Sequence, residues 1–154
     1  MSNKKIYKVI GIMSGTSMDG LDCSFIETDG INYCKTIKEH SYNYNTEYKK
    51  KLKKIIKNLP NSKNKRIIYA KKNETFVTNE ILKLINKFIK KIGNKKKNID
   101  LIGLSGQTIY HNPNNNYSLQ LNSGQSLYNN INIPVISNFR DKDLKLGGQG
   151  APIG

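Results

Sequence analysis

The chain has 154 residues, with 26 Lys or Arg against 11 Asp or Glu, and its formal net charge is +15. A domain of this length buries roughly 70% of the surface that its unfolded chain exposes, which is enough for one hydrophobic core. The apolar runs are too short to span a bilayer and no secretion signal opens the sequence, so we expect no membrane segment. Cys23 and Cys34 form no disulfide or zinc pattern, which favours a reducing cytoplasm.

The positive charge comes almost entirely from lysine, since Arg66 and Arg140 are the only arginines. Proteins that bind nucleic acid favour arginine for bidentate contacts and place aromatic side chains among the basic ones. The lysine runs at 49–54 and 95–97 fall instead on a predicted helix and a predicted loop. We interpret them as solvated surface and do not expect nucleic acid as a partner, although a phosphate-binding lysine patch stays open as an alternative.

Runs of β-branched residues bounded by turn signals predict six strands. In chain order they are residues 5–12, 21–28, 31–38, 100–104, 117–121 and 134–138. A glycine-containing turn separates the first two, and Asp29-Gly30 is a hairpin signal before the third. The chain therefore opens with a predicted three-stranded antiparallel meander.

Apolar residues at steps of three and four predict helices over 46–59, 63–92 and 123–131. Thr46 is the expected N-cap of the first helix, and Gly93 is expected to end the second. The pattern leaves open whether 63–76 belongs to the second helix or forms a separate turn. The residues after 138 predict a polar, glycine-rich loop. Strands followed by helices, and then by a strand–helix–strand unit, indicate a mixed α/β fold.

The turn after the first strand is the candidate site. Its hydroxyl, glycine and carboxylate residues are Ser14, Gly15, Thr16, Ser17, Asp19, Gly20 and Asp22. Backbone N–H groups at a glycine turn bind anions, and the hydroxyls add donors. The two carboxylates suit a divalent cation that bridges to phosphate. The alternative is an ordinary β-turn, since neither nucleotide-binding glycine motif with a following helix is present.

Four segments carry a resemblance to a known family. Residues 11–22, GIMSGTSMDGLD, resemble the N-terminal signature of the anhydro-N-acetylmuramic acid kinases, which are actin-like kinases. Residues 102–111, 118–121 and 139–152 resemble further family segments in the same order. The resemblance covers the chain apart from its lysine-rich helices. It implies the N-terminal lobe of an actin-like (ribonuclease H-like) ATPase, with a mixed sheet that opens on an antiparallel hairpin and is flanked by helices.

The resemblance also implies an activity and its ligands. The family uses ATP and Mg²⁺ to open 1,6-anhydro-N-acetylmuramic acid with water and to phosphorylate O6, in the recycling of cell-wall sugar. The implied nucleotide-binding residues are Gly15, Thr16, Ser17, Met18, Asp19, Gly20, Leu21 and Asp22. The implied sugar-binding residues are Gln107, Thr108, Arg140 and Gln149. Arg140 suits a carboxylate, although an ion pair with Asp141 or Asp143 is the alternative.

Residues 1–154 are thus expected to be an incomplete enzyme. The resemblance places the second lobe and the catalytic base beyond Gly154, assigns no metal ligand and no catalytic residue here, and allows a homodimer in the full-length form. We expect no turnover from this chain alone. Leu104-Ser105 replaces the family's Ser-His, Asn138 replaces an Asp, and Asn122-Ser123 replaces Gly-Asn. A non-enzymatic ATP- or sugar-binding module and a basic nucleic-acid-binding protein are the alternatives.

Overall fold

The computed structural model describes residues 5–93 and 99–150. Within them a five-stranded sheet has the order β3-β2-β1-β4-β7. Its strands are β1 (Tyr7–Ser14), β2 (Gly20–Thr28), β3 (Cys34–Asn43), β4 (Leu101–Ser105) and β7 (Val135–Ser137). β1, β2 and β3 are antiparallel neighbours, whereas β4 is parallel to both β1 and β7. The predicted meander is confirmed, and so is the expected mixed α/β class of the actin-like lobe.

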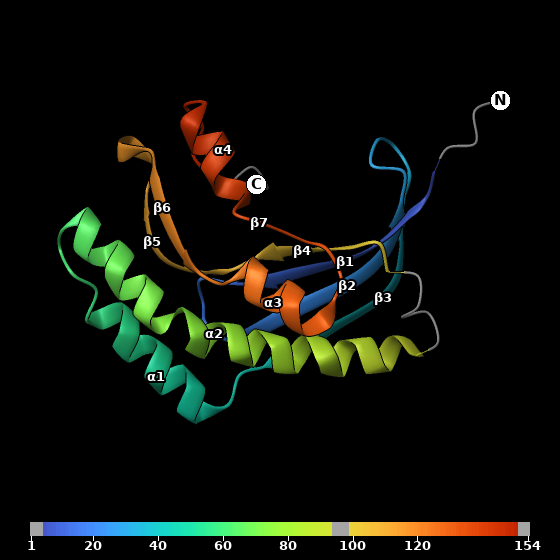
Figure 1. The fold of residues 1–154 in the computed structure, drawn as a ribbon, viewed down its shortest axis with the longest axis horizontal. Helices are drawn as coiled ribbons and strands as arrows, with labels where there is room; N and C mark the ends of the chain where they lie inside the picture. The colour runs from blue at the N-terminus through green and yellow to red at the C-terminus, as the bar shows by residue number, and fades with distance from the viewer. Residues whose placement is uncertain (1–4, 94–98, 151–154) are drawn as a thin grey trace.

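Helices cover one face of this sheet. α2 (Lys63–Ile92) and α3 (Gly124–Ile131) contact its strands, and α1 (Thr46–Lys57) lies beyond α2 on the same side (Figure 1). Figure 1 shows α1 and α2 along one side of the sheet and α4 (Phe139–Lys145) on the other. Both long helices follow a predicted stripe, and α2 is one continuous helix of 30 residues that includes 63–76. No helix in the described part of the chain is long and apolar enough to cross a bilayer.

The core lies between α2 and the covered face of the sheet. Alternate strand residues point toward it, as the period of a β-strand requires. Its fully buried large side chains are Ile10, Leu21, Phe25, Leu52, Ile81, Ile85, Phe88, Ile102, Leu104, Leu121 and Leu127, whereas Leu144 of α4 is buried outside this core. In the 49–54 run Lys49 is half-buried and the other lysines are exposed, as the solvated-surface interpretation predicts. The run at 95–97 lies outside the described residues.

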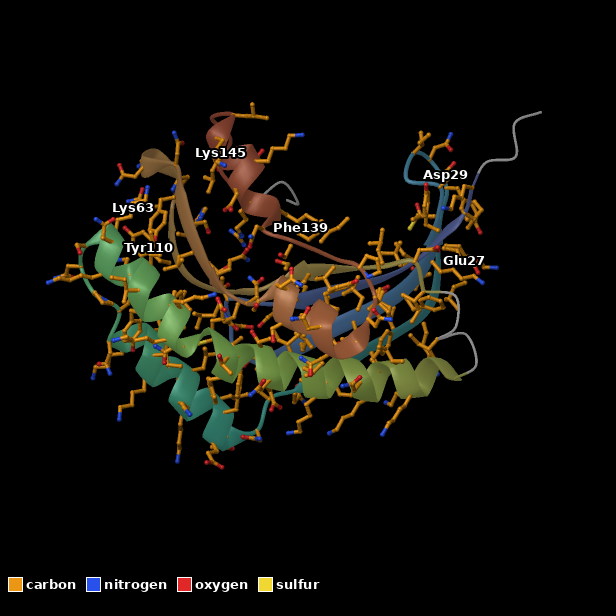
Figure 2. All side chains as sticks on the ribbon, in the orientation of Figure 1. Glu27, Asp29, Lys63, Tyr110, Phe139 and Lys145 are labelled. Atoms are coloured by element: carbon orange, nitrogen blue, oxygen red, sulfur yellow. The ribbon has the colours of Figure 1, made fainter. Side chains whose placement is uncertain are left out.

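A second, two-stranded sheet joins β5 (Gln107–Asn112) to β6 (Tyr117–Leu121) through a short 3-10 turn, η2 (Pro113–Asn115). β6 was predicted, but β5 was not. Figure 1 shows this hairpin rising from the end of the main sheet beside α4. Its far end lies near the start of α2, where the Arg66 guanidinium stacks 3.8 Å from the centroid of the Tyr110 ring. Lys63 and Tyr110 mark this contact region in Figure 2.

Three other sequence predictions need correction. Asn45, not Thr46, caps α1, because its side chain accepts the Tyr48 N–H at 2.8 Å. β3 begins at Cys34 rather than at residue 31, because Asp29 Oδ1 accepts three consecutive backbone N–H groups, those of residues 31–33, and holds them in a loop. The segment after residue 138 is not wholly a loop: Phe139–Lys145 forms the helix α4.

Candidate functional site

Three sequence motifs meet at one edge of the main sheet. β1, β4 and β7 are parallel, and they end at Ser14, Ser105 and Ser137. The carboxyl ends of parallel strands lie at the same edge, which is where α/β sheets bind their ligands. The glycine turn follows β1, the Gly-Gln-Thr segment follows β4, and the Asn-Phe-Arg segment follows β7. The topology therefore brings the glycine turn, which starts at Gly15, together with segments that start at Gly106 and Asn138.

The turn between β1 and β2 forms a short loop, residues 15–19, which we name the phosphate loop. The Met18 N–H closes it by donating to the Gly15 carbonyl at 3.2 Å, with Met18 in the left-handed conformation at φ 58°. The Tyr44 N–H holds its end by donating to the Asp19 carbonyl at 2.9 Å. Thr16 and Ser17 are exposed, so their hydroxyls are accessible to an anion.

The residues after the loop belong to the sheet. A Cβ on Gly20 would lie 2.2 Å from the Tyr42 carbonyl oxygen, so only glycine allows β2 to approach β3 at this point. Leu21 pairs with Ser14 and its side chain is fully buried. Of the eight residues implied to bind the nucleotide, Leu21 could therefore contact it only through its backbone.

Asp19 and Asp22 are the carboxylates nearest to this loop in sequence, and both are exposed. Asp19 lies 3.7 Å from the ammonium of the half-buried Lys49, and because the carboxylate itself is exposed the pair has little energetic weight. No group of three or more metal-ligating side chains occurs in residues 5–93 and 99–150. Mg²⁺ in kinases needs only one or two carboxylates, because phosphate oxygens and water complete its coordination. The donor set of Asp19 and Asp22 therefore fits Mg²⁺ held together with a nucleotide.

Gln107 is 0% exposed and lies directly beneath the phosphate loop. Its Oε1 accepts the Ser14 hydroxyl at 2.7 Å, and its Nε2 donates to the Gly15 carbonyl at 3.2 Å. Sequence reasoning expected this side chain near the sugar. The structure places it close to the site, but with both ends of its amide engaged by the protein.

Thr108, the next residue on β5, is half-buried. Its hydroxyl oxygen accepts the Gln120 Nε2–H at 3.3 Å, and the same amide donates to the Gly106 carbonyl at 2.9 Å. Because Gln120 occupies an acceptor lone pair, the Thr108 hydroxyl hydrogen is available to a ligand. Sequence analysis included Gln120 in a family segment without a role. Its contact with Thr108 depends on the pairing of β6 with β5, which the sequence did not predict.

Arg140 is half-buried in the first turn of α4. Within the described residues no ion pair joins it to Asp141 or Asp143. The Asp143 carboxylate instead accepts the Gly150 N–H at 2.7 Å and so holds the glycine-rich turn that follows α4. Gln149 lies in this turn and is exposed. The Arg140 guanidinium thus keeps donors for an anionic ligand.

A cavity of about 530 Å³ opens on the uncovered face of the sheet, next to the same edge. Gly11 and Gly103 lie side by side at its floor, and Met13, Asp22 and Ser105 line it toward the loop. Figure 2 shows Phe139 at the start of α4 on this side of the sheet. The cavity was not predicted from the sequence, because the pairing of the two glycines depends on the β1–β4 register.

The family departures fall in and around this region. Leu104 is fully buried in the core, whereas Ser105 lines the cavity in place of a histidine. Asn138 has a left-handed backbone with φ 62° and makes no side-chain cap of α4. Asn122 packs against Gly106, and its buried Nδ2 has no hydrogen-bond partner within residues 5–93 and 99–150. Of these residues only Ser105 lines the cavity, and none of them belongs to the phosphate loop.

The fold, with a hairpin loop at the carboxyl edge of its mixed sheet, defines an actin-like lobe. The chain belongs to the anhydro-N-acetylmuramic acid kinase family, whose family model matches residues 7–154. Curated relatives named anhydro-N-acetylmuramic acid kinase include one from Pelagibacter ubique, 35% identical over 97% of this chain. Those of Brucella canis and Zymomonas mobilis are each 33% identical over 95% and 94% of it. The chain spans 40% of the length of each of these relatives.

Proposed function

We propose that this chain is the nucleotide-binding N-terminal lobe of an ATP-dependent kinase acting on 1,6-anhydro-N-acetylmuramic acid. In the complete enzyme, water opens the anhydro bridge and O6 receives the γ-phosphoryl group, which gives N-acetylmuramic acid 6-phosphate and ADP. The reaction would serve the recycling of cell-wall sugar in a reducing cytoplasm, which suits the free thiols of Cys23 and Cys34. The observation that carries the proposal is the convergence of three family segments on one sheet edge beside the cavity.

The residues of this lobe would bind and orient the ligands. The phosphate loop offers backbone N–H groups and the hydroxyls of Thr16 and Ser17 to the phosphates of ATP. Asp19 and Asp22 would hold Mg²⁺, which supplies charge neutralisation on the transferring phosphoryl group. Thr108 and Arg140 would orient the sugar, with the guanidinium on its lactyl carboxylate. Gln149 is a further candidate sugar contact from the turn after α4.

The general base is not assigned to this chain. A base must lie within about 3 Å of the water that it activates, or reach it through another water. We propose that this carboxylate, and the second lobe that carries it, belong to the part of the family's length that residues 1–154 do not span. The isolated chain is therefore expected to bind its ligands without turnover.

Calorimetry with Mg·ATP tests the nucleotide site. The wild-type chain is expected to bind, and Asp22→Asn is expected to weaken binding roughly tenfold, because a carboxylate–Mg²⁺ contact is lost. Glu39→Gln is the matched control: it neutralises another carboxylate that lines the same cavity, one strand farther from the loop. Equal affinities for all three proteins, or no heat with ATP at all, would contradict the proposed site.

A chimera tests the activity. This chain is joined to the part of the Pelagibacter relative that lies beyond the matched region, and release of ADP is followed with and without the anhydro sugar. The proposal expects sugar-dependent ADP release from the chimera and none from residues 1–154. A non-enzymatic binding module would give an inactive chimera that still binds ATP. Sugar-dependent ADP release by the 154-residue chain would refute its proposed inactivity.

A further inference from the structure

A buried hydrogen-bond network supports the phosphate loop from below. It consists of Tyr44, Ser14 and Gln107, which are 3%, 5% and 0% exposed. The Ser14 Oγ lies 3.0 Å from the Tyr44 hydroxyl and 2.7 Å from Gln107 Oε1. The three residues come from the segment after β3, the end of β1 and the start of β5, so the network joins three separate parts of the chain.

The direction of each hydrogen bond is determined by the donors available. Ser14 has one hydroxyl hydrogen, which it gives to Gln107 Oε1, since an amide oxygen can only accept. Tyr44 must then donate to Ser14 Oγ. Burial raises the pKa of Tyr44 to about 12, so its hydroxyl keeps this proton at neutral pH.

The other end of Gln107 reaches the loop itself. Its Nε2 donates to the carbonyl of Gly15, the same oxygen that accepts the Met18 N–H closing the loop. Nε2 also lies 3.3 Å from the Thr108 carbonyl, which ties the loop to β5. Tyr44 adds a second anchor, since its backbone N–H donates to the Asp19 carbonyl. Both ends of the loop therefore depend on this one network.

Direct contact between Gln107 and a sugar would disrupt these bonds. The side chain would have to leave the Ser14 hydroxyl and the Gly15 carbonyl, and buried polar groups without partners are costly. We propose that Gln107 is a positioning residue, which acts through the phosphate loop by fixing the Gly15 carbonyl and the Ser14 hydroxyl, and does not touch the ligand. Its effect on phosphate binding rests on the proposed function, whereas its effect on the loop does not.

Hydrogen exchange measured by NMR at single amides tests this directly. Gln107→Met keeps an unbranched side chain of similar length but removes both polar ends. The reporters are the amides of Met18 and Tyr44, which close the two ends of the loop. We expect both to exchange at least about tenfold faster in Gln107→Met, because they open locally once the network is lost.

Thr78→Val provides the matched control. Thr78 is also buried and polar, and its hydroxyl accepts the Ser123 N–H at 3.1 Å, in a network separate from the loop. This variant should speed hydrogen exchange at the Ser123 amide. The amides of Met18 and Tyr44 should exchange faster only to the extent that the whole protein is less stable. Gln107→Met should instead speed exchange at Met18 and Tyr44, and change exchange at Ser123 only through the overall loss of stability. If Met18 and Tyr44 respond equally to both substitutions, Gln107 is only a stabilising core residue and the proposal is wrong.

Ser14→Ala serves as the second variant if Gln107→Met does not fold. It removes the central hydroxyl with little change in volume, and the same two amides should again exchange faster than in Thr78→Val. Unchanged exchange at Met18 and Tyr44 in Ser14→Ala would overturn the proposal.

Calorimetry with Mg·ATP separates this inference from the proposed function. Gln107→Met is expected to weaken ATP binding at least fivefold or so, while Thr78→Val leaves the affinity unchanged at a temperature where both are folded. If the wild-type chain does not bind ATP but the exchange pattern is as expected, the nucleotide function fails and the positioning role stands. If ATP binds equally to all three proteins, Gln107 does not position the loop for phosphate and that part of the proposal fails.

Discussion

The two faces of the main sheet are built from residues of different size. The face toward α2 carries large apolar side chains at alternate positions, such as Ile10, Phe25 and Leu104, all buried. The opposite face carries Gly11, Ser24 and Gly103 at the matching positions of β1, β2 and β4, with Glu39 beyond them on β3. The first face holds the fold together. The second leaves the hollow that adjoins the candidate site.

This difference has a consequence for parallel strands. β1, β4 and β7 are parallel, and parallel sheets are usually covered on both faces. Here Met13 and Ile136 remain about half exposed on the uncovered side. We therefore expect substitutions of large side chains on the covered face to change stability strongly, and those on the uncovered face to change mainly ligand binding.

The two cysteines give the largest expected contrast. Cys23 lies on the covered face, and burial together with the Asp22 carboxylate raises the pKa of its thiol to about 12, whereas Cys34 is exposed at the start of β3. At pH 8 the Cys23 thiol therefore stays protonated and shielded, and we expect iodoacetamide to label Cys34 at least roughly a thousandfold faster. Mass spectrometry counts the labels. Cys34→Ser isolates the buried thiol, and rapid labelling of that variant without denaturant would contradict a closed core.

Two phenylalanines compare the faces with the same residue type. Phe25→Ala removes a fully buried ring and should cost about 3–5 kcal/mol of unfolding free energy. Phe139 is 46% exposed above Gly103, and Phe139→Ala should cost about 1 kcal/mol or less. Urea unfolding measures both. Equal losses would mean that the uncovered face contributes as much to the core as the covered one.

Two strand glycines, Gly11 and Gly20, both alternate with the buried residues of their strands, so their contrast depends on local backbone spacing and not on the face, and it is the smallest. Gly20→Ala would place a Cβ against the Tyr42 carbonyl oxygen, and moving a backbone apart should cost about 1–3 kcal/mol. A Cβ on Gly11 meets nothing closer than 4.0 Å, so Gly11→Ala should change stability by less than about 0.5 kcal/mol while filling part of the cavity floor. Thermal unfolding of the pair tests this. If Gly11→Ala lowers the stability as much as Gly20→Ala does, the two positions do not differ in the space that they offer a Cβ.

Local sequence signals predicted the elements that depend on neighbours along the chain. The apolar stripe of α2 and the β-branched runs of β1 and β2 are such signals, and they gave these elements nearly correct bounds. β5 escaped prediction because Gln107 and Thr108 have no strand pattern of their own and depend on pairing with β6. α4 was not predicted because its seven residues are too few to show a helical period, and because the glycines that follow it indicate a loop.

By itself, the sequence determined the family, the glycine-and-hydroxyl loop after the first strand, and the alternation that selects a covered face. These follow from residue order and from side-chain chemistry. Only the tertiary structure decided that the three segments share one edge, that Gly11 and Gly103 form the floor of a cavity, and that Gln107 points beneath the loop. Those facts depend on strand register and on burial, which arise from contacts between residues far apart in the chain.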